Sequence, residues 1–480
     1  MTERVVVSKP VFAGPAKRMF IDVLIRDVSL IPAILDLVDN SVDSANALLR
    51  AVSAQQTAGG GPELEPLWIE IVATPDRFEV RDNCEGIAVG AAENYVFALG
   101  RPADAPENQA AGTIGRFGVG MKRTLFKIAK RFTVHSSTHD STFRVDLDVD
   151  DWMDKRTDDD RDDWFIQLDV LEHPSEAARG TTISVEQLQP WVAAAFDDGK
   201  TLNRLREELR SRHRMAIEQG IRISLNGKLL KPLPSQVSLG DEIAPAHRAF
   251  TVAGDEGLPI DVRIFAGLVK AATHRGMDEE PEDGKEAERA AGWYVFGNGR
   301  LIVGPDRSDL TGWGGGRDLP RYHNQYSRFR GYVLMEAEDV RALPWTTDKT
   351  DIEPDQAAWV KIRREMVDAG REVIGHLNAI KRETGAPTEI THRPLSAALE
   401  SAGTKTVTIS EIAPTLTEDQ RAKAPAENPD ARPREGIRIA YAVDEDEYTE
   451  VASGLDVDTK KAVGERTFSY YLEHVVRGER

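Results

Sequence analysis

The segment IPAILDLVDNSVDSAN at residues 31–46 constrains the fold most. A helix advances about 100° per residue, so Asp36, Asn40 and Asp43 would fall on one stripe. The opposite stripe is apolar and consists of Ile31, Ile34, Val38, Val42, Ala45 and Leu49. The pattern predicts an amphipathic helix whose apolar side lies in a core. Taken alone, solvent exposure explains the polar stripe better than ligand binding does.

The composition sets limits on the kind of protein. The chain has 480 residues, enough for about two or three domains with full cores. Its net charge of −19, from 61 basic and 80 acidic residues, argues against a surface built for unspecific nucleic-acid binding. Its one cysteine, Cys84, excludes a disulfide framework and a cysteine-based zinc site. Without a long apolar run or a signal-peptide core, we expect a cytoplasmic protein and no membrane contact.

Periodicity places further elements along the chain. Helices are predicted over 20–50, 88–99, 118–130, 198–219 and 355–383. Strands are predicted over 67–73, 77–81, 131–137, 142–148, 163–170 and 180–188, and within 223–232, 260–269, 292–303 and 329–337. A shift to Pro, Ala, Thr and Glu predicts a linker over 384–435, followed by a small module at 436–480 with one strand and two short helices.

Two turns carry candidate binding groups. The strand at 77–81 runs into Asp82-Asn83-Cys84-Glu85-Gly86-Ile87, where Asp82 can accept a hydrogen bond from an exocyclic amine or cap the next helix. The loop GTIGRFGVGMK at 112–122 places three glycines before a helix, which exposes backbone N–H groups to an anion. Its spacing is neither the dinucleotide motif nor a Walker loop.

Four motifs occur in order: DLVDNSVDSA, DNCEGI, GRFGVGMK and GTT. Together they resemble the GHKL ATPase superfamily, which includes gyrase B subunits, MutL, the ninety-kilodalton heat-shock chaperones, MORC proteins and histidine kinases. The resemblance covers residues 20–190 and implies ATP and Mg²⁺ as cofactors. It implies an α+β chain whose residues 1–220 form an ATP-binding Bergerat-fold α/β sandwich.

The resemblance assigns roles on the first helix. Asn40 would be the magnesium ligand, since magnesium prefers oxygen ligands and takes few protein groups beside nucleotide phosphates. Asp36 stands where the family usually has Glu, and would be the general base for the attacking water. Its side chain is one methylene shorter, so we expect slow turnover. Asp43 would form hydrogen bonds in the nucleotide site rather than act as a catalyst.

The second motif would read the base. Asp82 would pair with the adenine amino group, with Gly86 and Ile87 in the turn beside it. The family pattern is D-x-G-x-G, and Cys84 replaces the first glycine, so we expect a slightly altered turn. A catalytic Cys84 is the rival interpretation and is disfavoured, because no histidine nearby in the sequence is placed to activate it.

The third motif would bind the phosphates, and the fourth would lie near the base. Residues 100–117 would be a lid that orders on nucleotide binding. The resemblance assigns the cradle to Gly115, Gly118, Val119, Gly120 and Met121, and a phosphate-neutralising charge to Lys122. Thr181 and Thr182, after Gly180, match the fourth motif.

The second domain, expected at 221–383, resembles the transducer of the GHL branch, an α/β domain of the ribosomal-protein type with four strands. In that branch a transducer lysine reaches back to the γ-phosphate. Lys349, just before the long helix, fits this place and would act in catalysis by sensing charge; Arg300 is a lesser candidate. A transducer, and no phosphoacceptor hairpin before the first motif, disfavour a histidine kinase.

The resemblance therefore implies an ATPase clamp that forms a homodimer on binding ATP and reopens on hydrolysis. Two clients stay open. The first is DNA, in genome maintenance or phage defence, on likeness to MORC and MutL alone. The second is a protein partner of a chaperone-like or signalling module. A basic stripe inside a dimer would favour DNA, and an exposed apolar patch on the transducer or C-terminal module would favour a protein.

Overall fold

The structure is a computed structural model. It describes residues 16–19, 29–57, 65–98, 120–158, 162–171, 178–270, 289–346, 349–384, 394–401, 403–425, 442–455, 457 and 459–477. Two compact units divide the chain, residues 1–431 and residues 432–480.

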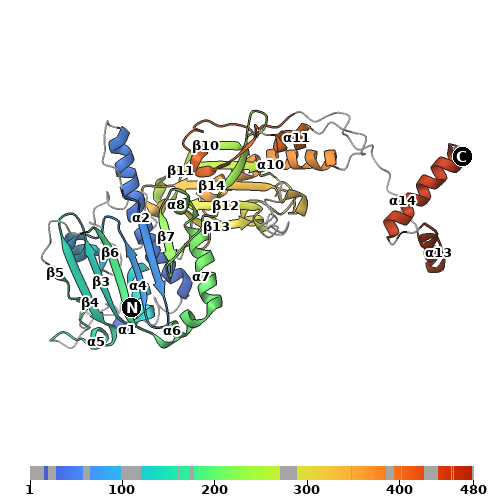
Figure 1. The fold of residues 1–480 in the computed structure, drawn as a ribbon. Helices are drawn as coiled ribbons and strands as arrows, with labels where there is room; N and C mark the ends of the chain where they lie inside the picture. Colours follow the sequence, from blue (N-terminus) through green and yellow to red (C-terminus); the bar gives the residue numbers. More distant parts are fainter. Residues whose placement is uncertain are drawn as a thin grey trace, which may run out of the picture. The chain divides into compact units, whose positions relative to one another are not determined.

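An eight-stranded sheet forms the first half of the larger unit (Figure 1). Its order is β5-β4-β3-β6-β2-β1-β7-β8, with β1 and β7 parallel and the other pairs antiparallel. The strands are β1 Trp68–Ala73, β2 Phe78–Asp82, β3 Ala129–Ser137, β4 Thr142–Asp148, β5 Asp169–Leu171, β6 Gly180–Leu188, β7 Arg222–Leu225 and β8 Lys228–Leu229.

Helices cover one face of this sheet. The described ones are α1 Lys17–Met19, α2 Leu30–Thr57, α3 Val89–Ala91, π-helical η2 Ala92–Val96, α4 Gly120–Ile128, α5 Val149–Asp154, α6 Pro190–Asp197, α7 Gly199–Arg212 and α8 Arg214–Glu218. The apolar side of α2, including Ile34, Val38 and Val42, shares one core with inward strand residues such as Val80 and Ile183. The predicted amphipathic helix is thus confirmed over α2; residues 20–28 lie outside the described part.

A five-stranded sheet follows, in the order β10-β11-β14-β12-β13. Its strands are β10 Ala246–Ala253, β11 Pro259–Leu268, β12 Gly292–Gly297, β13 Arg300–Asp306 and β14 Phe329–Glu336. Side chains alternate between its faces: Trp293 and Val333 join the core beside helix α10, Ala357–Thr384, while Tyr294 stacks on Tyr332 at the other face. The 3-10 turns η4 Asp255–Gly257, η5 Asp309–Thr311, η6 Asn324–Tyr326 and η7 Val340–Ala342 complete this half.

The second face of this sheet is covered by later residues. Strand β9, Gln236–Leu239, pairs with β15, Lys405–Thr408, and α12, Ile409–Ile412, follows directly. Helix α11, Pro394–Glu400, packs on α10 through Leu395 and Leu399. The predicted linker over 384–435 is therefore wrong for residues 394–425, because apolar side chains spaced along this segment are buried in the core.

Other boundaries also differ from prediction. Strands β7 and β8 pair within the first sheet, so residues 222–229 belong to it rather than to the expected second domain. The second sheet has five strands where four were expected. The strand predicted over 163–170 is confined to β5, because β4 offers pairing partners only to residues 169–171. The helix predicted over 198–219 is divided at His213 into α7 and α8.

The smaller unit contains α13, Glu445–Leu455, α14, Lys460–Tyr471, and π-helical η9, Leu472–Val476. The two predicted helices are thus present, and the predicted strand at 437–443 lies largely outside the described residues. Within the part of the chain that is described, no helix is long and apolar enough to cross a membrane.

Candidate functional site

The polar side of α2 is unevenly exposed. Asp36 is 6% exposed and Asp39 is fully buried, whereas Asn40 is exposed and Asp43 is half-buried. Burying a carboxylate is costly unless a cation or several hydrogen bonds compensate it. The two buried aspartates therefore require partners, and the second sheet supplies most of them.

Two cations from the second half reach these aspartates. Lys349 Nζ lies 3.2 Å from Asp36 Oδ1 and 3.0 Å from Asp39 Oδ2. Arg300 Nη1 also pairs with Asp39 Oδ2 and lies 3.8 Å from Asp36 Oδ1. From α4, Arg123 Nη2 lies 3.5 Å from Asp36 Oδ2. Three cations thus converge on Asp36 and Asp39, and Asp43 adds a third carboxylate that acts on Lys349.

Local backbone structure fixes both second-sheet cations. Arg300 follows the Asn298-Gly299 turn, whose positive φ values of 47° and 84° are those of a tight hairpin. Asn298 is itself pinned, because its side chain bonds both backbone groups of Ala337. Lys349 has φ of 55°, a conformation that non-glycine residues seldom adopt and that a surrounding turn must stabilise.

The surroundings of Lys349 also shift the pKa of its ammonium. Burial lowers the pKa of the Lys349 ammonium, with Arg300 acting in the same direction and Asp36 opposing both. An ammonium held in this way is stabilised mainly by its carboxylate partners. Its charge therefore depends on the presence of an anion close by.

Asp82 forms a second centre, at the end of β2. Its Oδ2 accepts from Ser41 Oγ at 2.6 Å, and its Oδ1 accepts from the N–H groups of Cys84 at 3.0 Å and Thr181 at 3.2 Å. Burial raises the pKa of the Asp82 carboxyl, and these hydrogen bonds oppose the rise. The carboxylate is thus fixed by neutral donors before any ligand arrives.

Two glycines allow the chain to close around Asp82. Gly86 has φ of 77°, and a Cβ there would lie 2.1 Å from the carbonyl oxygen of Ser137. Gly180 has φ of 136°, and its Cβ would lie 2.1 Å from the carbonyl oxygen of Asp82. Neither position accepts a side chain. Beside Gly86, the Ile87 N–H donates to Ser136 Oγ at 2.8 Å.

Cys84 belongs to the core of this turn. It is fully buried, its Sγ lies 3.5 Å from the carbonyl oxygen of Ser41, and burial and Asp82 raise the pKa of its thiol. A nucleophilic cysteine needs a lowered pKa and access to substrate. This geometry argues against the catalytic interpretation of Cys84.

The two threonines of the fourth motif face opposite sides of the sheet. The Thr181 hydroxyl bonds Ser136 Oγ at 2.8 Å, and its N–H bonds Asp82. Thr182 pairs with Arg81, whose side chain is exposed, so it projects to the other face. Thr181 is therefore the threonine that contacts the Asp82 turn, and the predicted role of Thr182 near the base stays a prediction.

The glycine-loop residues are only partly described. Gly115, Gly118 and Val119, with the lid at 100–117, lie outside the described residues. Gly120 opens α4 so close to α2 that a Cβ would meet Asp36 at 3.4 Å. Met121 is buried in the core.

Lys122 is buried and bonded to backbone carbonyl oxygens. Its ammonium donates to the carbonyl oxygens of Val96, at 2.7 Å, and Ala98. It is 2% exposed, and burial lowers its pKa to about 8. In this structure the Lys122 ammonium holds the end of η2, and its predicted role at the phosphates stays a prediction.

Asn40 fits a magnesium ion that is held mainly by phosphates. Its amide is exposed one helical turn beyond Asp36. Among the described residues, no group of three or more His, Cys, Asp or Glu side chains could hold a metal. Magnesium usually takes one or two protein groups and completes its shell with phosphate and water oxygens. The donor set therefore suits magnesium bound together with a nucleotide.

Asp39, Arg123 and His213 were not predicted from the sequence as members of this site. Asp39 lies within the quoted helix at i+3 from Asp36, so its spacing could have been noticed. His213 is fully buried, with Nε2 3.9 Å from Asp39 Oδ1, and burial lowers its pKa to about 3, so its ring is neutral. Nothing in the local sequence around His213 indicates this contact.

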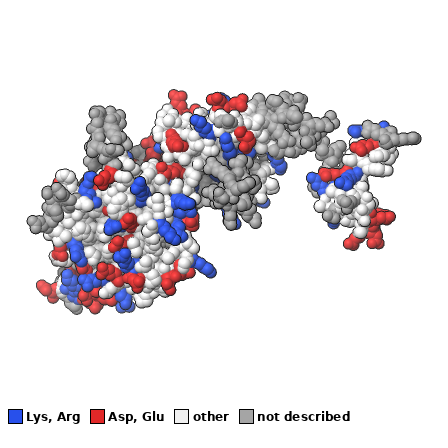
Figure 2. Space-filling model, in the orientation of Figure 1, with Lys and Arg blue, Asp and Glu red and all other residues white. Residues whose placement is uncertain are grey.

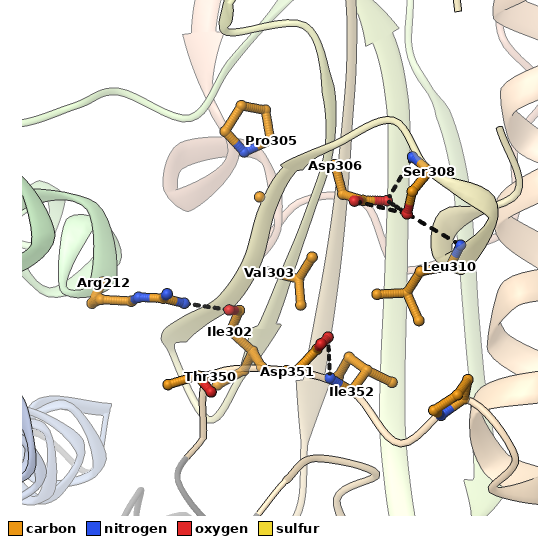
Figure 3. Close-up of a pocket in the computed structure, with 12 residues that line it drawn as sticks. Arg212, Ile302, Val303, Pro305, Asp306, Ser308, Leu310, Thr350, Asp351 and Ile352 are labelled. Carbon is orange, nitrogen blue, oxygen red and sulfur yellow. Dashed lines mark hydrogen bonds between the residues drawn. The ribbon is translucent and has the colours of Figure 1, made fainter. Parts of the chain in front are cut away.

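A separate hollow of about 490 Å³ lies beside the Lys349 turn (Figure 3). Arg212, Asp306 and residues 350–352 are among those that line it. Arg212 donates to the carbonyl oxygens of Leu301 and Ile302, and Asp306 accepts from Ser308. None of the sequence-predicted nucleotide residues lines this hollow, so it is distinct from the candidate site.

Comparison with known proteins identifies the kind of domain that contains α2. Residues 28–171 match the family of histidine kinase-, DNA gyrase B- and HSP90-like ATPases. No curated protein matches the chain. The matched region holds α2, Asp82 and the glycine loop, so it is a GHKL-type ATPase domain, which implies ATP binding and hydrolysis.

Proposed function

We propose that this chain, whose residues 28–171 are a GHKL-type ATPase domain, is an ATP-driven conformational clamp of the GHL branch. The observation that carries the proposal is the contact of Lys349 and Arg300, from the second half, with Asp36 on α2. A lysine so placed can detect whether the neighbouring site holds phosphate. Binding energy at the nucleotide would then change how the two sheets pack.

Each site residue has a role in this proposal. Asp36 accepts the proton of the attacking water, and Asn40 binds the magnesium ion, which neutralises phosphate charge when bound. Lys349 stabilises negative charge at the transferred phosphoryl group. Asp36 cannot act as a base while it is paired with Lys349, so the lysine must leave it before hydrolysis.

The remaining residues bind the rest of the nucleotide. Asp82 accepts from the adenine amino group, within a turn closed by Gly86 and Ile87. Asp43 contributes hydrogen bonds from the edge of α2. The backbone N–H groups of Gly115, Gly118 and Gly120 bind the phosphates. Val119, between the last two glycines, and Met121, after Gly120, belong to the same phosphate-binding segment. Such backbone N–H groups at the start of α4 suit an anion.

A protein client is supported by the smaller unit. Phe468, Tyr470 and Tyr471 on α14 are 57%, 60% and 58% exposed, and Val475 and Val476 of η9 are exposed as well. Apolar side chains gathered in this way mark interaction surfaces. On the face drawn in Figure 2, basic and acidic side chains of the larger unit are interspersed, and the chain is acidic overall. DNA is the second candidate client, on family resemblance alone.

The test is the solution mass by light scattering after size exclusion, with magnesium and a non-hydrolysable ATP analogue. We expect a shift from monomer to dimer when the analogue is added. Asp82→Asn serves as the matched control, because it should not bind the analogue and should not shift. An unchanged wild-type mass at saturating analogue would contradict ATP-driven dimerisation.

A further inference from the structure

The mechanism above leaves Asp39 without a role. It is fully buried three residues after Asp36, and it binds Lys349 Nζ at 3.0 Å through Oδ2. Lys349 is about as close to Asp39 as to Asp36, where the distance is 3.2 Å. Two carboxylates therefore share one lysine that, in the proposed function, must reach a phosphate.

The contact crosses the two halves of the larger unit. Asp39 lies on a helix of the first sheet, and Lys349 precedes α10 on the second. Lys349 itself has a positive φ, and its N–H donates to Thr346 O at 2.9 Å, so local backbone contacts fix its position. The ammonium is thus placed at Asp39 by a constrained turn.

Asp39 also has a replacement donor. Its Oδ1 has no hydrogen-bond partner among the described residues, and His213 Nε2 lies 3.9 Å from it. Both ring nitrogens of the fully buried His213 likewise lack a hydrogen-bond partner in the described part of the chain. A shift of about 1 Å would bring a neutral N–H within hydrogen-bond distance of Oδ1.

We infer that Asp39 is a positioning residue that holds Lys349 on α2 in the absence of nucleotide, and that Lys349 exchanges Asp39 for the nucleotide's phosphates. After the exchange, Arg300 keeps its ion pair with Asp39 Oδ2, and the His213 N–H donates a hydrogen bond to Oδ1. Asp39 is thereby kept from becoming a buried charge without partners. The inference rests on the proposed function, in which Lys349 contacts phosphate.

The exchange has a cost that ATP must meet. Nucleotide binding competes with the Asp39–Lys349 contact, so the apparent affinity is lowered by the fraction of protein in which Lys349 is docked. While Lys349 is bound to Asp39, it also pairs with Asp36, and this ion pair keeps Asp36 from accepting a proton. Hydrolysis is therefore restrained until the phosphates attract the lysine away. Weakening the Asp39–Lys349 contact should therefore tighten nucleotide binding. If Asp39 had only a structural role, its replacement would weaken nucleotide binding instead.

The test is a double-mutant cycle in the full chain, read by calorimetry with magnesium and a non-hydrolysable ATP analogue. We expect Asp39→Asn to lower the Kd by on the order of 10-fold. In a Lys349→Met background the same substitution should leave the Kd unchanged. Asp318→Asn, which breaks the Arg363 ion pair away from the cluster, is the matched control and should not change the Kd.

Three results would overturn the inference. One is an Asp39→Asn Kd equal to or above that of the wild type. Another is a full effect of Asp39→Asn in the Lys349→Met background. If Asp39→Asn alone does not fold, the comparison of Lys349→Met with the double variant replaces it. Unequal Kd values for these two proteins would overturn the inference. If the wild type binds no analogue, the proposed function fails first and the inference fails with it.

Discussion

Two buried carboxylate centres lie on the same domain and are stabilised in opposite ways. Asp82 is held by a hydroxyl and two backbone N–H groups, all from the first half of the chain. Asp36 and Asp39 are held by cations, of which Lys349 and Arg300 come from the second. In the proposed function, the neutral donors around Asp82 remain in place, whereas Lys349, from the second half of the larger unit, changes partners.

In the proposed function, the Asp82 centre recognises the base and the Asp36 centre responds to phosphate. The Asp82 centre is closely packed, because Gly86 and Gly180 leave no room for side chains. The Asp36 centre is bistable in principle, because phosphate can replace a carboxylate as the partner of an ammonium. A conformational machine needs both kinds of site, one to bind and one to switch.

Removing the proposed base should have the largest effect. Asp36→Ala should lower ATP turnover by about 10² to 10⁴-fold, because no carboxylate takes the proton of the water. Nucleotide binding should persist, since the Asp82 centre is intact. Asp36→Glu restores the carboxylate usual in the family and should retain turnover. Persistent turnover in Asp36→Ala, measured by phosphate release, would place the base elsewhere.

Altering the neutral centre should act on binding instead. Asp82→Asn should weaken ATP binding by on the order of 100-fold or more, because the amide cannot replace both charge-assisted acceptor oxygens. The matched control is Asp76→Asn, an exposed aspartate in the β1–β2 turn. Calorimetry measures both, and an unchanged affinity for Asp82→Asn would rule out the adenine assignment.

Lys122 provides a buried cation that donates to the carbonyl oxygens of Val96 and Ala98. Its pKa is lowered to about 8 from 10.5, so the unfolded chain binds its proton more tightly than the folded chain. The buried charge of Lys122 lowers the free energy of unfolding by its full amount below pH 8. This loss of stability disappears as the pH rises from 8 to 10.5. Relative to Lys122→Met, the wild type should gain up to about 3 kcal/mol over that range.

Urea unfolding of both chains at pH 7.5 and pH 9.5 measures this gain. The difference in the free energy of unfolding between wild type and Lys122→Met should move in favour of the wild type at the higher pH. A pH-independent difference would mean that the Lys122 ammonium is better solvated than its burial indicates.

The smallest expected effect distinguishes two neighbouring threonines. Thr181→Val removes the hydroxyl bonded to Ser136 and should weaken ATP binding by about 1 kcal/mol, several-fold in Kd. Thr182→Val changes the opposite face of β6 and should leave the Kd unchanged. The reverse order of effects would show that the fourth motif acts through Thr182.

Sequence reasoning predicted the parts of the site that local pattern encodes. The stripe on α2 and the Asp82 turn follow from helical period and turn chemistry. Lys349 was predicted from family resemblance, not from its surroundings. Asp39 and His213 became apparent only when the fold brought together residues more than 170 positions apart.

Two departures from the local sequence pattern have related causes. Residues 394–425 have the composition of a linker, yet Leu395, Leu399, Ile409 and Ile412 find buried places on the second sheet. Lys122 follows a phosphate-type motif, but carbonyl oxygens at the end of η2 bind its ammonium. In both cases tertiary contacts outweighed what the local sequence indicated.

The central claim is that Lys349, from the second half of the larger unit, takes part in the ATPase site. The most direct measurement is steady-state ATP turnover of Lys349→Met, with affinity determined in parallel. Lys361→Met, which alters an exposed lysine on α10, is the control. We predict a loss of about 100-fold or more in turnover with ATP still bound. Turnover equal to that of the wild type would contradict the account.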